Sequence, residues 1–98
     1  MNRLLPHRRA VIASVVLARV DDVEFATLRE IAEVSDSVLS KHLSALSEAG
    51  YVKLSKARQD GRQRTWAAFT PTGRKAFAAH MRALQALVAS AEQAVAAE

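Results

Sequence analysis

The chain has 98 residues, a length typical of one domain. Half of the residues are hydrophobic but only 5% are aromatic, so we expect a modest core of mainly aliphatic side chains. The formal net charge of +4 favours an anionic partner, either nucleic acid or a membrane surface. The absence of cysteine excludes disulfides, thiol redox chemistry and thiolate metal sites.

The composition also argues against a membrane or secreted protein. No apolar run approaches the ~20 residues of a membrane-spanning helix. Arg8 and Arg9 precede a short apolar run, but Arg19, Asp21 and Asp22 follow it at once, so we interpret this segment as a helix and not as a secretion signal. We therefore expect a cytoplasmic protein. The three histidines form no ligand-spaced pair, so no metal and no cofactor are expected.

A first helix is predicted from Pro6 to about Val20, because proline suits a helix start. Its apolar residues nearly surround the axis, and such a helix is buried on more than one side. In so small a domain, the second side is expected to contact another subunit. Residues 23–25 can then form a short strand.

A second helix is predicted over roughly residues 28–34. Thr27 and Glu30 have the spacing of a capping box, in which a threonine precedes a glutamate by three positions. The residues expected to face inward are Leu28, Ile31 and Ala32.

A third helix is predicted over about residues 35–49. Ser35 is a candidate N-cap, Asp36 suits the positive end of the helix, and Gly50 is a typical residue for its end. An apolar stripe at spacings of four and three is formed by Leu39, Leu43 and Leu46.

A β-hairpin is predicted over about residues 51–69. Alternation indicates one strand at 51–56, and its partner follows at 65–69. The polar segment between them contains Asp60-Gly61, a strong signal for a hairpin turn.

A final helix is predicted over about residues 71–96, opened by Thr70 as cap and Pro71 at the first position. Apolar residues recur there at alternating spacings of four and three, which is a heptad pattern. They are Phe77, Met81, Leu84, Val88, Ala91 and Val95. The distal half is longer than the domain needs, so we expect a homodimer whose interface includes Val11, Val15, Met81, Leu84, Val88, Ala91 and Val95.

This order predicts a mainly α fold with a small β-hairpin. Two short helices joined by a tight turn and followed by a hairpin form a winged helix-turn-helix, here with a long C-terminal dimerisation helix. Residues 1–98 are expected to form a single winged-helix DNA-binding domain.

Four segments resemble the small winged-helix transcriptional regulators of the MarR and ArsR type, and they are Leu28–Ala32, Ser35–Leu43, Leu46–Val52 and Arg64–Arg74. The resemblance implies a bacterial protein that binds specific DNA as a dimer, usually as a repressor. ArsR-type sensors often carry cysteine or histidine metal sites, which this chain lacks. MarR-type proteins usually have extra helices around a ligand pocket, so no small-molecule inducer is assigned here.

The third helix is expected to enter the major groove as the recognition helix. Opposite its leucine stripe lie Ser37, Lys41 and Ser44, with Ser40 at the edge. Short hydroxyls can approach bases closely, and lysine can reach a guanine or a phosphate.

The hairpin is expected to lie beside the DNA as the wing. The wing residues expected to contact DNA are Arg58, Arg62, Gln63 and Arg64. Further phosphate contacts are assigned to Thr27, Arg29 and His42, although His42 is also a candidate for packing beside the leucine stripe.

We therefore expect a sequence-specific DNA-binding transcriptional regulator, a dimeric repressor on an inverted repeat of double-stranded DNA. The alternative is a winged-helix protein–protein interaction module without DNA binding, although such modules tend to lose the basic wing. A membrane-surface protein explains the apolar faces less well than a core does. An enzyme is the weakest interpretation, because no catalytic constellation is found.

Overall fold

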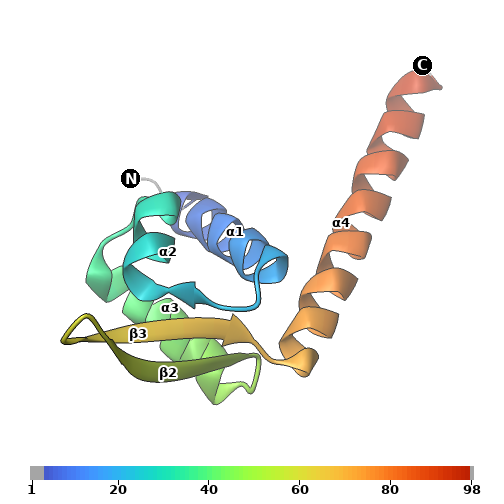
Figure 1. The fold of residues 1–98 in the computed structure, drawn as a ribbon. Helices are drawn as coiled ribbons and strands as arrows, with labels where there is room; N and C mark the ends of the chain where they lie inside the picture. Colours follow the sequence, from blue (N-terminus) through green and yellow to red (C-terminus); the bar gives the residue numbers. More distant parts are fainter. Residues whose placement is uncertain (1–3, 98) are drawn as a thin grey trace.

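The computed structural model describes residues 4–97 (Figure 1). Its elements in chain order are α1 (Leu4–Arg19), β1 (Val23–Glu24), α2 (Phe25–Ala32), α3 (Asp36–Glu48), β2 (Val52–Gln59), β3 (Arg62–Phe69) and α4 (Pro71–Ala96). The strands form one antiparallel sheet in the order β1-β3-β2. This is the predicted winged-helix fold, with a long C-terminal helix.

The core lies between α1, the α2–α3 pair and the inner face of the sheet. The largest fully buried side chains are four leucines: Leu17, Leu28, Leu39 and Leu43. The other buried residues surround them, and they are Ala13, Val23, Ala32, Val52, Ala67 and Phe69. The expectation of an aliphatic core is confirmed, because Phe69 is the one aromatic residue among these buried side chains.

Helix α2 differs from its prediction at both ends and on one face. It begins at Phe25 and is preceded by Glu24, whose side chain makes no capping hydrogen bond, so the predicted capping box is wrong. The reason is that β1 runs directly into the helix, where Phe25 packs against the core. The inward orientation of Ile31 is also wrong, since its side chain is 47% exposed. Leu28 and Ala32, four residues apart, occupy the buried side instead.

Helix α3 has the predicted ends. The Ser35 hydroxyl accepts a hydrogen bond from the backbone N–H of Val38 at 3.2 Å, which confirms the predicted cap. After the helix, Gly50 adopts a φ of 83°, a left-handed conformation that favours glycine. Leu39 and Leu43 are buried and Leu46 is partly buried against the core, so the leucine stripe is confirmed.

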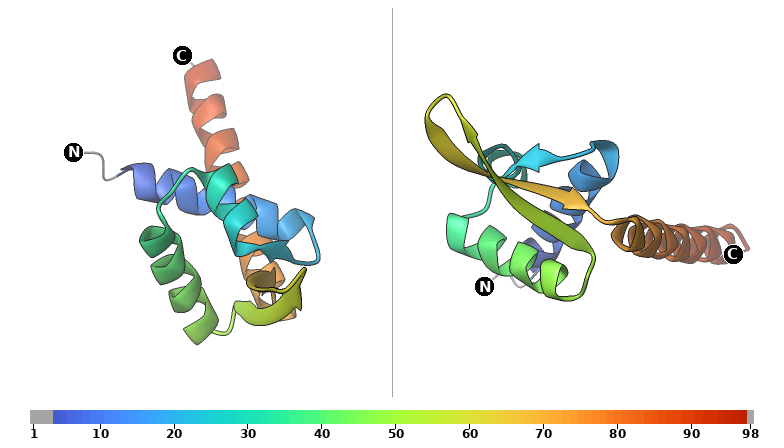
Figure 2. Two further views of the ribbon diagram at one scale, coloured as in Figure 1. Left: turned by 60° about the vertical axis from the view of Figure 1, so that its left-hand side comes forward. Right: turned by 60° about the horizontal axis from the view of Figure 1, so that its bottom comes forward.

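The hairpin is longer and its loop shorter than predicted. Both strands extend through the basic segment, so that Gln59 pairs with Arg62 and only Asp60 and Gly61 remain in the turn. Their φ values of 54° and 76° match a type I′ turn, which suits the twist of two antiparallel strands. The wing arginines therefore lie on strands and not in a loop. Figure 2 shows the hairpin twisting away from the body, opposite α4.

The start of α4 is fastened to the rest of the domain. The Thr70 hydroxyl accepts a hydrogen bond from the Gly73 N–H and donates one to the Gly50 carbonyl oxygen, which confirms the predicted cap. The Arg74 guanidinium donates to the carbonyl oxygens of Ala18 and Val20 at 3.0 and 2.8 Å. The helix then projects beyond the body (Figure 1), so its direction is set at its first turn.

The first turn of α4 approaches the start of the hairpin so closely that position 73 requires glycine. A Cβ atom there would lie 2.0 Å from the backbone oxygen of Tyr51, a distance that no side-chain adjustment relieves. We predict that Gly73→Ala lowers the free energy of unfolding by about 3 kcal/mol or more, measured by urea denaturation. The control is Gly50→Ala. A Cβ atom at this position has open space around it, so only the positive φ should lower the free energy of unfolding, by about 1 kcal/mol. Equal losses in the two variants would contradict the steric explanation.

Candidate nucleic-acid interface

The outer face of α3 carries the four residues predicted to read DNA. Ser37, Ser40, Lys41 and Ser44 are all exposed, while Leu39 and Leu43 are buried on the opposite side. The structure therefore brings the four together on one solvent-facing surface. None of the four is acidic, so this surface combines short hydroxyls with one positive charge.

An ion pair joins the last turn of α2 to the N-terminal end of α3. The Nε atom of Arg29 lies 3.0 Å from a carboxylate oxygen of Asp36, the first residue of α3. Arg29, predicted to contact phosphate, thus has a protein partner in an exposed ion pair that links the two helices. Thr27, the second predicted contact, is exposed on α2.

The residues of the wing alternate between two faces of the hairpin. Arg58 lies directly opposite Gln63, and Gln59 lies directly opposite Arg62. Since neighbouring residues on a strand point to opposite faces, Arg58 and Gln63 share one face while Arg62 and Arg64 share the other. The four wing residues predicted from sequence are thus split into two pairs.

One face of the hairpin continues the surface of α3. Ser40 and Ser44 line a hollow of about 230 Å³ together with Leu54 and Thr65 of the hairpin. Lys56 pairs with Thr65 across the strands and therefore lies on this same face. Lys56 was left out of the predicted contact set. The period-two alternation from Leu54 through Lys56 to Arg58 was the signal that could have included it.

Arg64 is held by the protein itself. Its Nη1 atom donates a hydrogen bond to Oε2 of Glu24 at 2.6 Å, and the two side chains are 33% and 19% exposed. The Nε atom of Arg64 is buried without a hydrogen-bond partner. Much of the Arg64 guanidinium therefore faces the domain. Arg62, two residues earlier on the same strand, is exposed.

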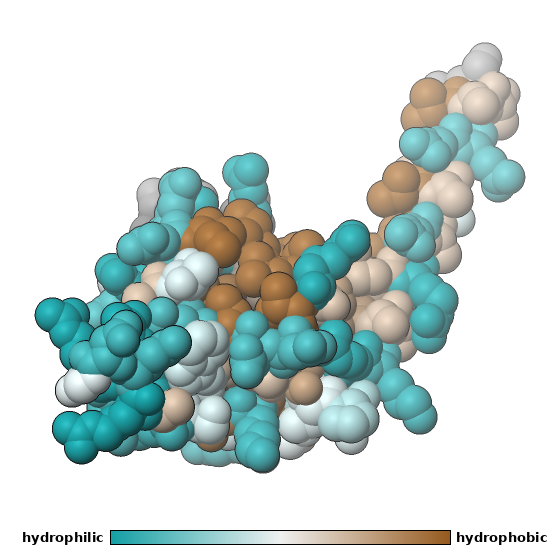
Figure 3. Space-filling model, viewed as in Figure 1, coloured by the Kyte–Doolittle hydropathy of each residue, from teal (hydrophilic) through white to brown (hydrophobic). Residues whose placement is uncertain are grey.

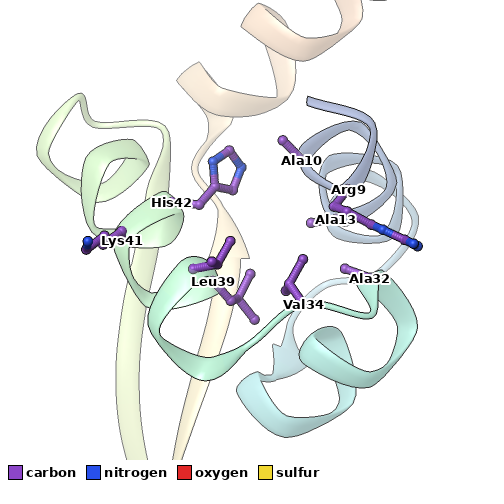
Figure 4. Close-up of a pocket in the computed structure, with 9 residues that line it drawn as sticks. Arg9, Ala10, Ala13, Ala32, Val34, Leu39, Lys41 and His42 are labelled. Carbon is purple, nitrogen blue, oxygen red and sulfur yellow. The ribbon is translucent and has the colours of Figure 1, made fainter. Parts of the chain in front are cut away.

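His42 lies in an apolar hollow of about 260 Å³ between α1 and α3 (Figure 4). Its ring projects into this space, while Lys41 points away from it (Figure 4). Ala10, Ala13 and Leu39 line the hollow, and burial among such groups lowers the pKa of the His42 imidazole from its ordinary value. This position favours packing over a phosphate contact.

Helices α1 and α4 carry much of the exposed apolar surface of the molecule (Figure 3). On α1, Val11 is 40% exposed and Val15 is partly buried. On α4, Met81 is partly buried, and the exposed residues are Leu84, Leu87, Val88, Ala91 and Val95. Leu87, 67% exposed, was missed because it lies outside the strict heptad pattern. Its spacing of three from Leu84 could have indicated it.

Other kinds of site find no support in the part of the chain that the structure describes. No three histidine, aspartate or glutamate side chains gather there in a way that could hold a metal ion. No helix within residues 4–97 combines the length and apolar character that crossing a bilayer requires. The exposed surfaces of α3, the hairpin and the two apolar helices remain as candidate interaction surfaces.

The sequence matches the family described as winged helix DNA-binding domain over residues 8–88. No curated protein matches it. Among solved structures, the transcriptional regulator homologue from Pyrococcus horikoshii OT3 is 21% identical, with a TM-score of 0.77. The alignment covers 83% of this chain and 80% of that one.

Two further structures share the fold. A MarR family transcriptional regulator from Silicibacter pomeroyi DSS is 20% identical with a TM-score of 0.66, and the alignment covers 83% of this chain and 54% of that chain. Reduced AbfR bound to DNA is 19% identical with a TM-score of 0.69, and the alignment covers 79% of this chain and 53% of that chain. This chain thus spans about half the length of both.

The position of His42 predicts a pH dependence of stability. The pKa of His42 is lowered in the folded state. At pH values below the ordinary pKa of about 6.5, the unfolded state therefore binds more protons than the folded state does. The free energy of unfolding should therefore fall as the pH drops from above 6.5 into the acid range. We expect His42→Gln to flatten this dependence in urea denaturation, whereas His80→Gln, which changes an exposed histidine, should not. Parallel pH profiles for His42→Gln and the unchanged protein would contradict the proposed packing.

Proposed function

Because the chain belongs to the winged helix DNA-binding domain family, we propose that it is a DNA-binding transcriptional regulator. The observation that carries this proposal is the shared surface of α3 and the hairpin, where hydroxyls and positive charges lie together. The family and the fold are those of regulators, so we propose no catalytic activity and a location in the cytoplasm, with the DNA.

Helix α3 is proposed to enter the major groove and to read the sequence. In helix-turn-helix proteins the N-terminal half of the second helix contacts base edges. Ser37, Ser40 and Lys41 lie in that half of the exposed face, and Ser44 follows about one turn further along it. Asp36 stands at the leading end of α3, but its carboxylate is already paired with Arg29, so part of its repulsion of phosphate is offset.

The hairpin is proposed to follow the DNA backbone beside α3. Arg58 and Gln63 on the face nearer α3, and Arg62 on the other, are exposed and can contact phosphates or enter the minor groove. Lys56 is added to this set because it shares the face of Arg58. Thr27 remains a proposed phosphate contact on α2.

The protein is proposed to act as a homodimer through α1 and α4. Helix α4 has 26 residues, about 39 Å at 1.5 Å per residue, and its distal half carries apolar side chains that its own domain leaves exposed. Val11 and Val15 of α1 are proposed to join the interface. Two subunits related by a twofold axis would present two α3 helices to an inverted repeat with half-sites about 10 base pairs apart. From the resemblance to MarR-type and ArsR-type proteins, we propose that the dimer acts as a repressor.

The proposed reading by α3 predicts a loss of specificity in Lys41→Ala. A binding site is first selected from a random DNA pool, and both this site and a scrambled duplex are then titrated at one salt concentration. The difference in binding free energy between the specific and the scrambled duplex should fall by roughly 1–3 kcal/mol if Lys41 contacts a base. The control is Lys75→Ala, which removes the same charge from the first turns of α4.

Two outcomes would contradict the proposed DNA binding or the proposed role of α3. If selection enriches no sequence and the protein shifts no DNA, the proposed function is wrong and the alternative of a protein–protein interaction module is favoured. If Lys41→Ala and the three serine-to-alanine variants all keep the original ratio, DNA is bound but α3 does not read it.

The proposed dimer predicts that a charge on the exposed apolar stripe separates the subunits. Val88 is 54% exposed in the single chain, so Val88→Glu should leave the fold intact while burying a charge at the interface. We expect the dimer dissociation constant to rise by about tenfold or more in sedimentation analysis. Ser90→Glu places the same charge on the opposite side of α4 and serves as control. An unchanged monomer–dimer equilibrium in Val88→Glu would remove this stripe from the interface.

A further inference from the structure

We propose that Arg64 is a positioning residue, held by Glu24 to set the angle of the wing, and that it makes no direct contact with DNA. This inference rests on the proposed function. It assigns to Glu24 a role in DNA binding even though the residue is acidic and lies outside the surface of α3.

The first argument is the geometry of the sheet. Strand β1 pairs only with Trp66 and Ala67 of β3. The part of β3 from Arg62 to Thr65 extends beyond β1 and is supported by β2 on one edge alone. A two-stranded ribbon of this kind twists and bends easily. Its direction relative to α3 therefore needs a further contact.

The Glu24–Arg64 pair is placed where that contact is needed. Glu24 is the last residue of β1 and directly precedes α2, the first helix of the helix-turn-helix. The hydrogen bond of 2.6 Å joins this corner to the unsupported part of β3. Among the side-chain hydrogen bonds of the described residues, it is the one that links the distal hairpin to the helices.

The second argument is the orientation of the guanidinium. Both side chains are partly shielded from water, which strengthens a charge-assisted hydrogen bond. The Nε atom of Arg64 is buried, so this edge of the group cannot reach a phosphate. To present its whole guanidinium to DNA, Arg64 would have to leave Glu24 and expose a carboxylate beside the wing. Arg62, two residues earlier, is exposed and has no such cost.

The two possible roles of Arg64 predict opposite effects of removing Glu24. If Arg64 contacts phosphate, Glu24 competes for it, and removing this negative charge raises DNA affinity. If Arg64 positions the wing, removing Glu24 loosens the hairpin, and ordering it on DNA then costs conformational entropy. The affinity falls although the protein has become more positive.

The experiment is a double-mutant cycle with Glu24→Met, Arg64→Met and the double variant in the full chain. Each is titrated with the selected duplex at several salt concentrations. Arg62→Met serves as the reference for a lost phosphate contact, and Asp22→Asn as the reference for a lost negative charge near the sheet. Trp66, the only tryptophan, lies opposite Glu24 across the strands, so its fluorescence without DNA reports on the pair independently.

We expect each single variant to lose affinity about tenfold, with the double variant no weaker than either. The slope of affinity against salt should stay unchanged in all three, whereas Arg62→Met should lower it by about one. The Trp66 emission should shift alike in both single variants. If the methionine variants fail to fold, Glu24→Gln and Arg64→Lys should show smaller changes of the same sign.

The proposal is overturned if Arg64→Met lowers the salt slope as Arg62→Met does, or if Glu24→Met gains affinity as Asp22→Asn does. Additive losses in the cycle would overturn it as well. If the unchanged protein binds no DNA, the proposed function fails, and Trp66 decides the remaining question. Equal emission shifts then support the positioning pair, and an unchanged emission in either single variant rejects it.

Discussion

Four leucines from three helices are the largest fully buried side chains of one core cluster, and the rest of the molecule depends on their burial. Leu17 of α1, Leu28 of α2, and Leu39 and Leu43 of α3 are all almost fully buried. With so few aromatic residues, the domain has little other apolar volume with which to hold its helices together. Because Leu39 and Leu43 must face this core cluster, the opposite side of α3 must face solvent. The burial of leucine thus decides which side chains are available to a partner.

The surfaces outside this core are oriented by a small number of polar contacts. Arg29 joins α2 to α3 through Asp36, and Arg64 joins the hairpin to the start of α2 through Glu24. Arg74 joins the first turn of α4 to the end of α1. In each case an arginine reaches an element that is distant or separate in the chain. Part of the positive charge therefore joins elements of the molecule to one another, and the exposed remainder includes the residues of the wing and Lys41 of α3.

Much of the fold could be predicted from local patterns. The serine cap and leucine spacing of α3 depend only on residues close together in the chain. The same holds for the Asp60-Gly61 turn and for the Thr70-Pro71 start of α4, and all four were confirmed. The exposed residues of α3 followed directly, since a helix has one face opposite its apolar stripe. The start of α2 failed, because Thr27 and Glu30 formed a plausible local cap that the strand pairing of Val23 and Glu24 overrode.

The amino-acid sequence by itself thus determined the order of the elements, the leucine stripe of α3 and the exposed serines and lysine opposite it, since each depends on near neighbours and on helical or strand periodicity. Tertiary structure alone decided how the wing arginines are divided. Arg58, Arg62 and Arg64 look equivalent in the sequence, but the strand register separates their faces. Glu24, 40 residues away, then holds one of them. No local pattern encodes such a pairing, because it exists only once β1, α2 and β3 have been brought together by the core.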